Sequence, residues 1–132
     1  MKQKTLPQLK KQALELFTTY RKLTYLSKGD LRCYTCGKPL QANTSDCQLG
    51  HYLSRGAYPG LTFHPNNSRL QCFRCNCMLH GNTIEFRERL IAEIGLDEVE
   101  ALEAKRHEPV KLGRGDYEEM IRFFKQEIKL FC

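Results

Sequence analysis

The sequence predicts an α+β domain that is mostly helical, with a zinc-bound core of short strands between N-terminal and C-terminal helices. Three observations predict it. Apolar residues recur at helical spacing near both ends, the middle is rich in Cys, Asn and Gly, and two Cys-x2-Cys pairs bracket that middle. The 132 residues, 41% of them apolar, suit one domain with a small core. We expect a single domain over residues 1–132, with segments 1–30, 31–82 and 83–132.

The first helix is expected over residues 7–27. Pro7 suits a first helical position, apolar residues follow at intervals of three and four, and Ser27-Lys28-Gly29-Asp30 ends the pattern. The basic residues of this helix fall largely outside the apolar stripe: Lys10, Lys11, Arg21 and Lys22. The helix therefore has a basic side.

Positive charge is concentrated in the N-terminal two thirds. Residues 1–80 hold 12 Lys and Arg against 3 Asp and Glu, and the rest holds 9 against 12, so the parts carry +9 and −3. This asymmetry marks residues 1–80 as a candidate surface for a polyanion, with solvated lysines as the alternative. A secretory leader and a membrane-length apolar run of about 20 residues are both missing, so we expect a cytoplasmic protein without a membrane partner.

The cysteines point to metal binding. Cys33-x2-Cys36 and Cys72-x2-Cys75 are separated by 35 residues, and each pair can place two thiolates on one edge of a tetrahedral Zn²⁺ site. Buried free thiols are the alternative, and a catalytic zinc is disfavoured because four thiolates leave no open position. The remaining cysteines are expected to be small buried residues or incidental thiols: Cys47, Cys77 and Cys132.

Short strands and helices are expected along the rest of the chain. Residues 49–54 and 61–63 are predicted strands, and helix resumes near Cys72 or Cys75. A helix with an apolar face follows up to Gly95, then a short helix over 97–106, a linker over 107–115 and a last helix capped by Asp116.

Four polar residues that could serve chemistry lie within the zinc-binding segment or just after its last cysteine: His51, Asn67, Asn76 and His80. Asn76 and His80 are four residues apart, so on a helix they share a face and can hold a divalent cation. His51, on a strand, can face that cation. Each residue also has a structural alternative: a hydrogen-bonded histidine, a turn asparagine, a cap of the knuckle or a helix end.

This pattern resembles the HNH (ββα-metal) endonuclease superfamily, in an HNN form. The stretches GHYLSRG, LTFHPNNSRLQCFRCN and HGN, with Phe86, Leu90-Ile91 and Ile94-Gly95, resemble the phage NinG/Rap recombination family over roughly residues 31–105. The resemblance implies a zinc-bound ββα-metal core. It also implies a metal-dependent DNA endonuclease that cuts branched intermediates, such as D-loops and Holliday junctions, during phage recombination.

Roles for single residues follow from the resemblance. His51 would be the general base, Asn67 would hold the loop that carries it, and Asn76 would bind the catalytic Mg²⁺ or Mn²⁺, with His80 as a second ligand. The acidic residue usual directly before the histidine is missing, because Gly50 stands there. Where the NinG/Rap family often carries an acid, three positions before the histidine, the residue is Gln48.

Several alternatives stay open at this point. Arg55 and Arg69 can clamp phosphate oxygens or be solvated surface residues. The basic side of the first helix is expected to bind phosphates without reading sequence, and the products to be a 5′-phosphate and a 3′-hydroxyl. A relaxed HNH nicking nuclease and a non-catalytic zinc-bearing DNA-binding protein are the alternative functions. The apolar last helix, with Phe123, Phe124 and Phe131, can supply a homodimer interface or core.

Overall fold

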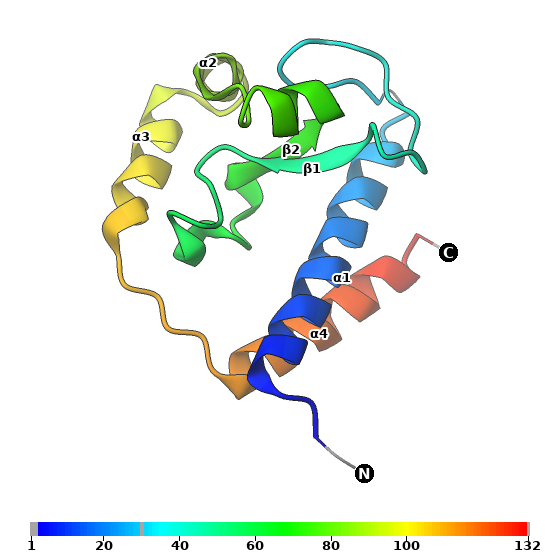
Figure 1. Cartoon of the computed structure of the whole chain (residues 1–132), viewed down its shortest axis with the longest axis vertical. Coiled ribbons are helices and arrows are strands. Elements are labelled where there is room, and N and C mark those ends of the chain that lie inside the picture. Colours follow the sequence, from blue (N-terminus) through cyan, green and yellow to red (C-terminus); the bar gives the residue numbers. More distant parts are fainter. Residues whose placement is uncertain (1–2, 30, 132) are drawn as a thin grey trace.

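A computed structural model gives the fold, and residues 3–29 and 31–131 are described. The predicted α+β, mostly helical class is confirmed. The helices are α1 (Leu6–Leu26), α2 (Thr83–Ile94), α3 (Leu96–Ala104) and α4 (Arg114–Lys129), and the strands are β1 (Gln48–His51) and β2 (Ser68–Gln71). Short helical turns complete the chain: η1 (Pro59–Leu61), η2 (Pro65–Asn67), η3 (Arg74–Met78) and η4 (Lys105–His107). In Figure 1, α1 and α4 cross below the sheet, while α2 and α3 lie above and beside it.

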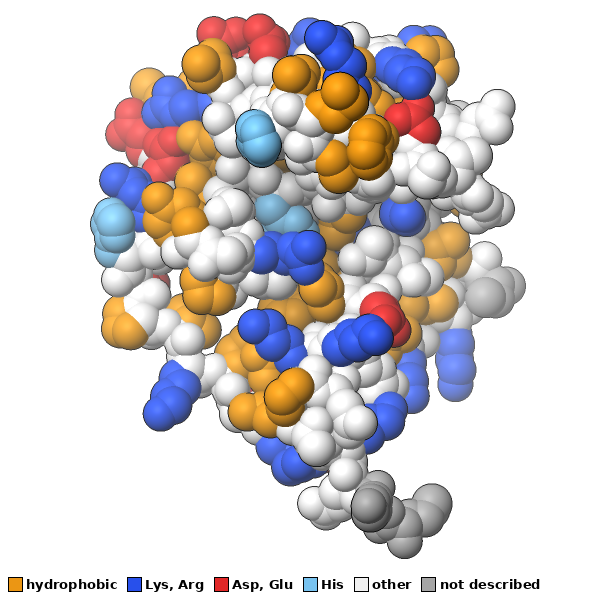
Figure 2. Space-filling model, in the orientation of Figure 1, with side chains coloured by type: hydrophobic (Ala, Val, Ile, Leu, Met, Phe, Trp, Pro, Cys, Tyr) orange, Lys and Arg blue, Asp and Glu red, His pale blue; other side chains and the backbone are white. Residues whose placement is uncertain are grey.

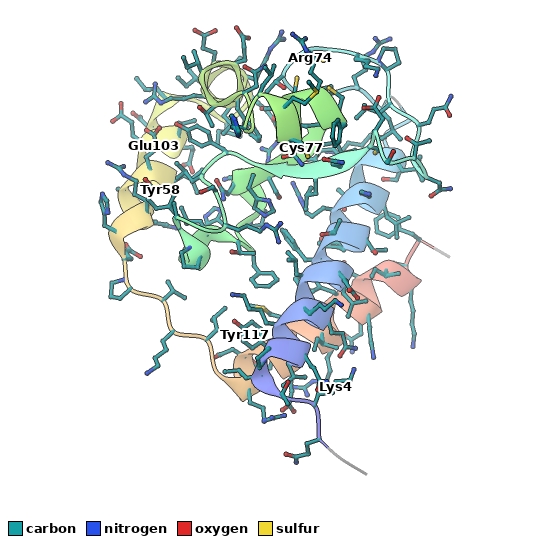
Figure 3. All side chains as sticks on the ribbon, in the orientation of Figure 1. Lys4, Tyr58, Arg74, Cys77, Glu103 and Tyr117 are labelled. Carbon is teal, nitrogen blue, oxygen red and sulfur yellow. The ribbon has the colours of Figure 1, made fainter. Side chains whose placement is uncertain are left out.

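Helix α1 begins one residue before the predicted range of 7–27 and packs on α4. The hydroxyl of Thr5 accepts a hydrogen bond from the Gln8 amide, and the Gln8 side chain accepts one from the Thr5 amide. Phe17, 1% exposed, packs on Phe124 of α4 with ring centroids 5.5 Å apart. The last helix thus supplies core to α1, and Tyr117 lies at the start of this contact (Figure 3).

The sheet is a two-stranded antiparallel pair in which Gly50 faces Arg69 and His51 faces Ser68. The predicted strand at 61–63 is wrong, because Leu61 ends a helical turn and the second strand is β2. Proline opens both η1 and η2, and its fixed φ favours helical turns over strand. Strand β2 is buried at all four positions although three of them are polar, so it shows no alternation of apolar and polar residues.

Helices α2 and α3 form the second half of the core. Phe86 and Leu90 of α2 and Val99 and Leu102 of α3 pack against Tyr52 and Leu61 from the segment after β1. Glu103 of α3 accepts hydrogen bonds from the Tyr52 hydroxyl and from Arg87 of α2 (Figure 3). This packing holds the segment that follows His51 against a rigid helical layer.

The last helix begins at Arg114, two residues before its predicted cap Asp116. Its N-cap is Gly113, and Asp116 is the third helical residue, whose carboxylate accepts a hydrogen bond from the Gly113 amide at 2.8 Å. A carboxylate in the first turn favours the positive end of the helix dipole, so Asp116 still stabilises the start of α4. Within the described residues, no helix is both long enough and apolar enough to cross a membrane.

Candidate functional site: a four-cysteine metal centre and a histidine pocket

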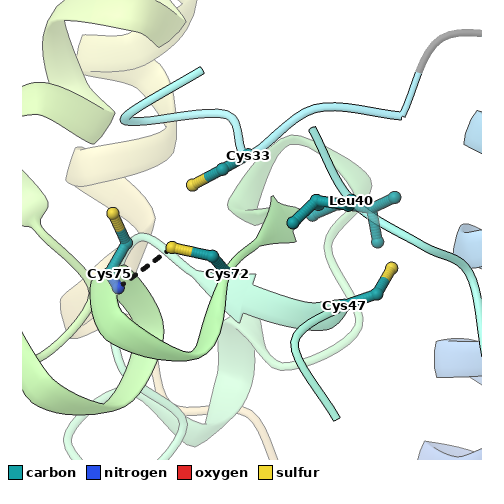
Figure 4. Packing of buried hydrophobic residues seen from close by; sticks show 6 residues of the cluster. Cys33, Leu40, Cys47, Cys72 and Cys75 are labelled. Atoms are coloured by element: carbon teal, nitrogen blue, oxygen red, sulfur yellow. Dashed lines mark hydrogen bonds between the residues drawn. The ribbon is translucent and has the colours of Figure 1, made fainter. Parts of the chain in front are cut away.

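The predicted cysteine cluster is confirmed. The sulfurs of Cys33, Cys36, Cys72 and Cys75 all lie within 4.8 Å of one another, and the Cys36 and Cys72 sulfurs are 3.8 Å apart. A zinc–sulfur bond of about 2.3 Å gives a tetrahedral S···S edge of about 3.8 Å, so the donor set and its spacing fit Zn²⁺. These four residues would hold a structural metal such as zinc. Figure 4 shows the sulfurs of Cys33, Cys72 and Cys75 turned toward one another.

Two tight turns present the sulfurs. In the first, the Cys33 amide donates to the Lys38 carbonyl at 2.8 Å and the Gly37 amide donates back to the Cys33 carbonyl at 2.9 Å. In the second, which directly follows β2, the Cys75 amide donates to the Cys72 sulfur at 3.4 Å. Backbone N–H bonds to sulfur favour the thiolate form, which is the form that binds metal.

Of the other cysteines, Cys47 and Cys77 take no part in this centre. Cys47 is 1% exposed and packs with Leu40, as the prediction of a small buried residue requires (Figure 4). Cys77 is exposed, and its thiol donates to the Gln48 side chain at 3.2 Å. Cys132 lies outside the described residues.

A polar pocket of about 480 Å³ opens beside the metal centre. It brings together residues that are far apart in the sequence: His51 at the end of β1, Arg55 in the following loop, Asn76 in η3 and His80 after it. Ser54, Gly56, Leu49 and Gly81 complete its lining. Figure 2 shows histidine side chains on this face of the molecule, with Lys and Arg side chains near them.

His51 is held in one tautomer. Its Nε2 lies 2.9 Å from the carbonyl oxygen of Thr62, which can only accept, so Nε2 carries the proton and Nδ1 carries the lone pair of the neutral ring. Burial lowers the pKa of His51 to about 4, and the charge of Arg55 adds to this, although the hydrogen bond to Thr62 opposes it. The imidazole is therefore neutral near pH 7 and can accept a proton at Nδ1.

Asn67 lies behind the pocket and not in its wall. Its side chain is fully buried, accepts from the Leu53 amide at 2.8 Å and donates to the Leu53 and Leu61 carbonyls at 2.9 and 3.1 Å. One amide thus joins the loop after β1 to η1. These bonds hold the segment that follows His51, which is the kind of contact expected of a loop-holding residue.

Asn76 lines the pocket and has a side-chain oxygen that could bind a ligand. Its Nδ2 donates to the Gln48 side chain at 2.8 Å, and Oδ1 accepts no hydrogen bond from the described residues. Amide oxygens are ligands that Mg²⁺ and other hard cations accept. Gln48 therefore orients Asn76, a contact that sequence reasoning missed because the two residues are 28 positions apart.

Asn76 and His80 share the pocket but not a helical face. The π-helical turn η3 ends at Met78, and His80 has a left-handed backbone with φ +52°. The Gly81 amide bonds back to the Cys75 carbonyl at 2.8 Å, which closes the chain around the second knuckle. The predicted i, i+4 pairing on a regular helix is therefore wrong, because the metal-binding turn reverses the chain before His80.

The fold itself excludes a side chain at Gly50. A Cβ there would lie 1.8 Å from Oε1 of Gln71, whose Nε2 donates to Thr35 and to the Gly81 carbonyl. Gln71 is fully buried and links the knuckle to the turn after η3. The acidic residue that HNH proteins carry before the histidine has no space in this chain.

Two of the predicted phosphate-binding arginines are structural. Arg69 is 3% exposed, pairs with Glu93 of α2 at 3.2 Å and donates to the Pro65 and Ser68 carbonyls. Arg21 donates to the Tyr25 hydroxyl and to the same two carbonyls, and burial lowers its pKa. The prediction that Arg69 clamps phosphate is wrong, because its guanidinium is buried and occupied. Of the other predicted residues, Lys10 and Lys11 are exposed and Lys22 is half-exposed.

Comparison with known proteins places this chain. The family described as Bacteriophage Lambda NinG protein matches residues 1–131. Protein ninG of Salmonella phage P22 is 32% identical over 99 residues, which cover 70% of this chain and 47% of that protein. Protein ninG of Escherichia phage lambda is 31% identical over the same shares, and that of Escherichia phage 933W is 33% identical over 78 residues, 59% of this chain and 37% of the relative.

The chain spans about half the length, or less, of these curated relatives. No solved structure matches it. Because the family match extends over residues 1–131, this protein belongs to the bacteriophage Lambda NinG family.

Proposed function

We propose that this protein is a metal-dependent DNA endonuclease of the HNH type, acting on branched recombination intermediates. One observation carries the proposal: a neutral, oriented His51 shares a single pocket with Arg55, Asn76 and His80. The order of two antiparallel strands followed by a helical turn is that of a ββα-metal element and supports it. The preference for branched DNA rests on the resemblance to the NinG/Rap family.

The residues of the pocket suit phosphodiester hydrolysis. His51 takes a proton from the attacking water at Nδ1, while the Thr62 carbonyl keeps the ring in place. Arg55 binds non-bridging phosphate oxygens. Asn76 Oδ1 and His80 would hold Mg²⁺ or Mn²⁺ together with several waters, and that ion would stabilise charge at phosphorus and on the leaving 3′-oxygen.

A specific observation favours a second candidate, a zinc-bearing DNA-binding protein without catalysis. Gln71 fills the space of a residue-50 side chain, so the pocket lacks the carboxylate that HNH sites usually carry. The cation would then be held by few protein ligands. A relaxed nuclease that nicks any duplex has the same residues and differs only in substrate.

Paired incision of a four-way junction would need two copies of the site, so we include a homodimer in the proposal. Phe124 is buried against α1 and is not available to a second copy, whereas Phe123 and Phe131 are 49% and 40% exposed. The phenylalanines of the last helix and its end are thus found partly in the core and partly at the surface. Light scattering of the protein with and without junction DNA measures the stoichiometry.

The test is cleavage of a labelled four-way junction and a matched linear duplex with Mg²⁺ or Mn²⁺. We expect wild type to cut the junction and His51→Ala to lose at least about a hundredfold in rate, the size typical of a missing general base. His107→Ala, an exposed histidine of η4, is the matched control and should cut normally. Equal cutting of both substrates would leave a general nuclease, and junction binding without cutting would leave the non-catalytic protein.

A further inference from the structure

Three adjoining hollows form one groove between α1 and the core. The pocket of His51 shares His51, Arg55 and Leu49 with a second hollow of about 410 Å³, walled by Leu14, Glu15, Thr18 and Thr19 of α1. Thr19 also lines a third hollow of about 470 Å³, which extends along α1 to Leu26 and is closed by Ala42, Asn43 and Thr44. We call these three adjoining hollows the α1 groove.

The groove is lined by two basic side chains that have no ion-pair partner among the described residues. Arg55 lines the first two hollows and Lys22 the third, and neither makes an ion pair or a side-chain hydrogen bond with the described residues. Arg21 and Arg69, by contrast, are engaged in contacts within the protein: Arg21 donates to Tyr25 and Arg69 pairs with Glu93. Side chains that keep their charge free in a groove are available to an external anion.

The wall between these two cationic side chains carries uncharged hydrogen-bonding groups. It offers the hydroxyls of Thr18 and Thr19 and the amide of Asn43, groups that commonly bind phosphate and sugar oxygens. Lys10 and Lys11 lie one helical turn before Leu14 and Glu15, so they continue the same side of α1 toward its N-terminus. Figure 2 shows Lys and Arg side chains over this part of the molecule.

Glu15 is the exception to this cationic and neutral lining. It is the single carboxylate among the residues that line the three hollows, and it pairs with no cation within residues 3–29 and 31–131. An unpaired carboxylate beside Arg55 repels a phosphate that enters the groove. Its removal should therefore strengthen anion binding, an effect that misfolding cannot imitate.

We propose that the α1 groove holds the backbone of one DNA strand next to the scissile phosphate, with Arg55 and Lys22 on phosphates of the same strand and Glu15 weakening the contact between them. The position of the scissile phosphate rests on the proposed function. The strand path does not need cleavage and can be measured by binding alone.

The experiment measures the affinity of a fluorescent four-way junction by anisotropy across a salt series, without added Mg²⁺ or Mn²⁺. Each lost phosphate contact lowers the slope of log K against log salt by about 0.9. We expect Lys22→Ala and Arg55→Ala each to show this loss, with about three- to tenfold weaker binding. Lys125→Ala, the same charge change on an exposed residue of α4, should leave slope and affinity unchanged.

Glu15→Gln should bind the junction severalfold more tightly at low salt. Equal weakening by Lys22→Ala and Lys125→Ala, or an unchanged affinity in Glu15→Gln, would overturn the groove proposal. If these variants behave as expected while wild type never cleaves, the strand path stands and the endonuclease proposal fails. If wild type cleaves and the groove variants bind like wild type, the endonuclease proposal stands and the strand path fails.

Discussion

The Nε2 atom of His51 lies 2.9 Å from the carbonyl oxygen of Thr62, a residue of the loop 11 positions further along the chain. This contact selects the tautomer, so the proton-accepting nitrogen is Nδ1. The position of the His51 ring therefore depends on the position of η1, because Thr62 directly follows that turn. The turn is held in place in its own right by Asn67 and by the α2–α3 layer.

The ionisation of His51 should therefore be unusual. With a pKa near 4, we expect the ring to remain neutral, with its proton on Nε2, from pH 8 down to about pH 5. Nitrogen-15 NMR of the labelled imidazoles reports both tautomer and titration, and His51→Gln assigns the signal. A midpoint near the ordinary value of about 6.5 would contradict the burial of this ring.

The same shift sets a pH dependence of stability. The folded pKa is lowered, so the unfolded chain binds a proton at His51 between about pH 6.5 and pH 4 that the folded chain does not bind. Wild type should lose stability as the pH falls through this window, by on the order of 1 kcal/mol per pH unit, and His51→Gln should lose less. Urea unfolding at pH 5 and pH 7 measures the difference.

Gly50 should reject even a methyl group. Gly50→Ala places Cβ 1.8 Å from Gln71 Oε1, and we expect a loss of about 1–3 kcal/mol in the free energy of unfolding. In a Gln71→Ala background the same change should cost much less. Gly56→Ala is the matched control, since nothing lies within 4 Å of its added Cβ. An equal cost of Gly50→Ala in both backgrounds would disprove the clash.

We expect the main effect of replacing Asn67 to be a loss of folding stability. Asn67→Ala leaves the buried Leu53 and Leu61 groups without partners, and each unpaired buried group costs about 1–3 kcal/mol. We expect a lowered melting temperature in calorimetry. Asn66→Ala, the neighbouring residue of η2, should change it little, because no hydrogen bond of the Asn66 side chain is needed to hold the loop.

Removal of the metal should unfold the middle of the chain. Cys33→Ser or Cys72→Ser is expected to lose zinc, measured by elemental analysis, and the cooperative thermal transition with it, because the four sulfurs lie within the small core cluster that joins the two cysteine segments. Cys77→Ser, an exposed cysteine outside the cluster, should retain one zinc per chain. A Cys33→Ser protein with full zinc content and normal melting would refute the four-cysteine site.

Much of the framework could be predicted from the chain. Helix α1 was expected over 7–27 and spans Leu6–Leu26, because a proline, a long apolar stripe and a terminating Ser-Lys-Gly-Asp stretch are all local signals. The two cysteine pairs were expected on one metal and do converge, because the thiolate chemistry of zinc allows few other arrangements. Strand β2 was missed because three of its four buried residues are polar and find their partners elsewhere in the fold.

The sequence by itself determined the helices, the metal-binding cysteines and the residue types of the pocket, because periodicity, capping and ligand spacing are local properties. Only the tertiary structure decided which basic residues stay free. Arg69 meets Glu93 from α2 and becomes structural, while Arg55 keeps its charge in the groove. It also decided that residue 50 must be glycine, since Gln71 from the neighbouring strand occupies that space. Contacts between segments far apart in the chain leave no periodic signal, so the availability of a charge or a cavity is set by packing alone.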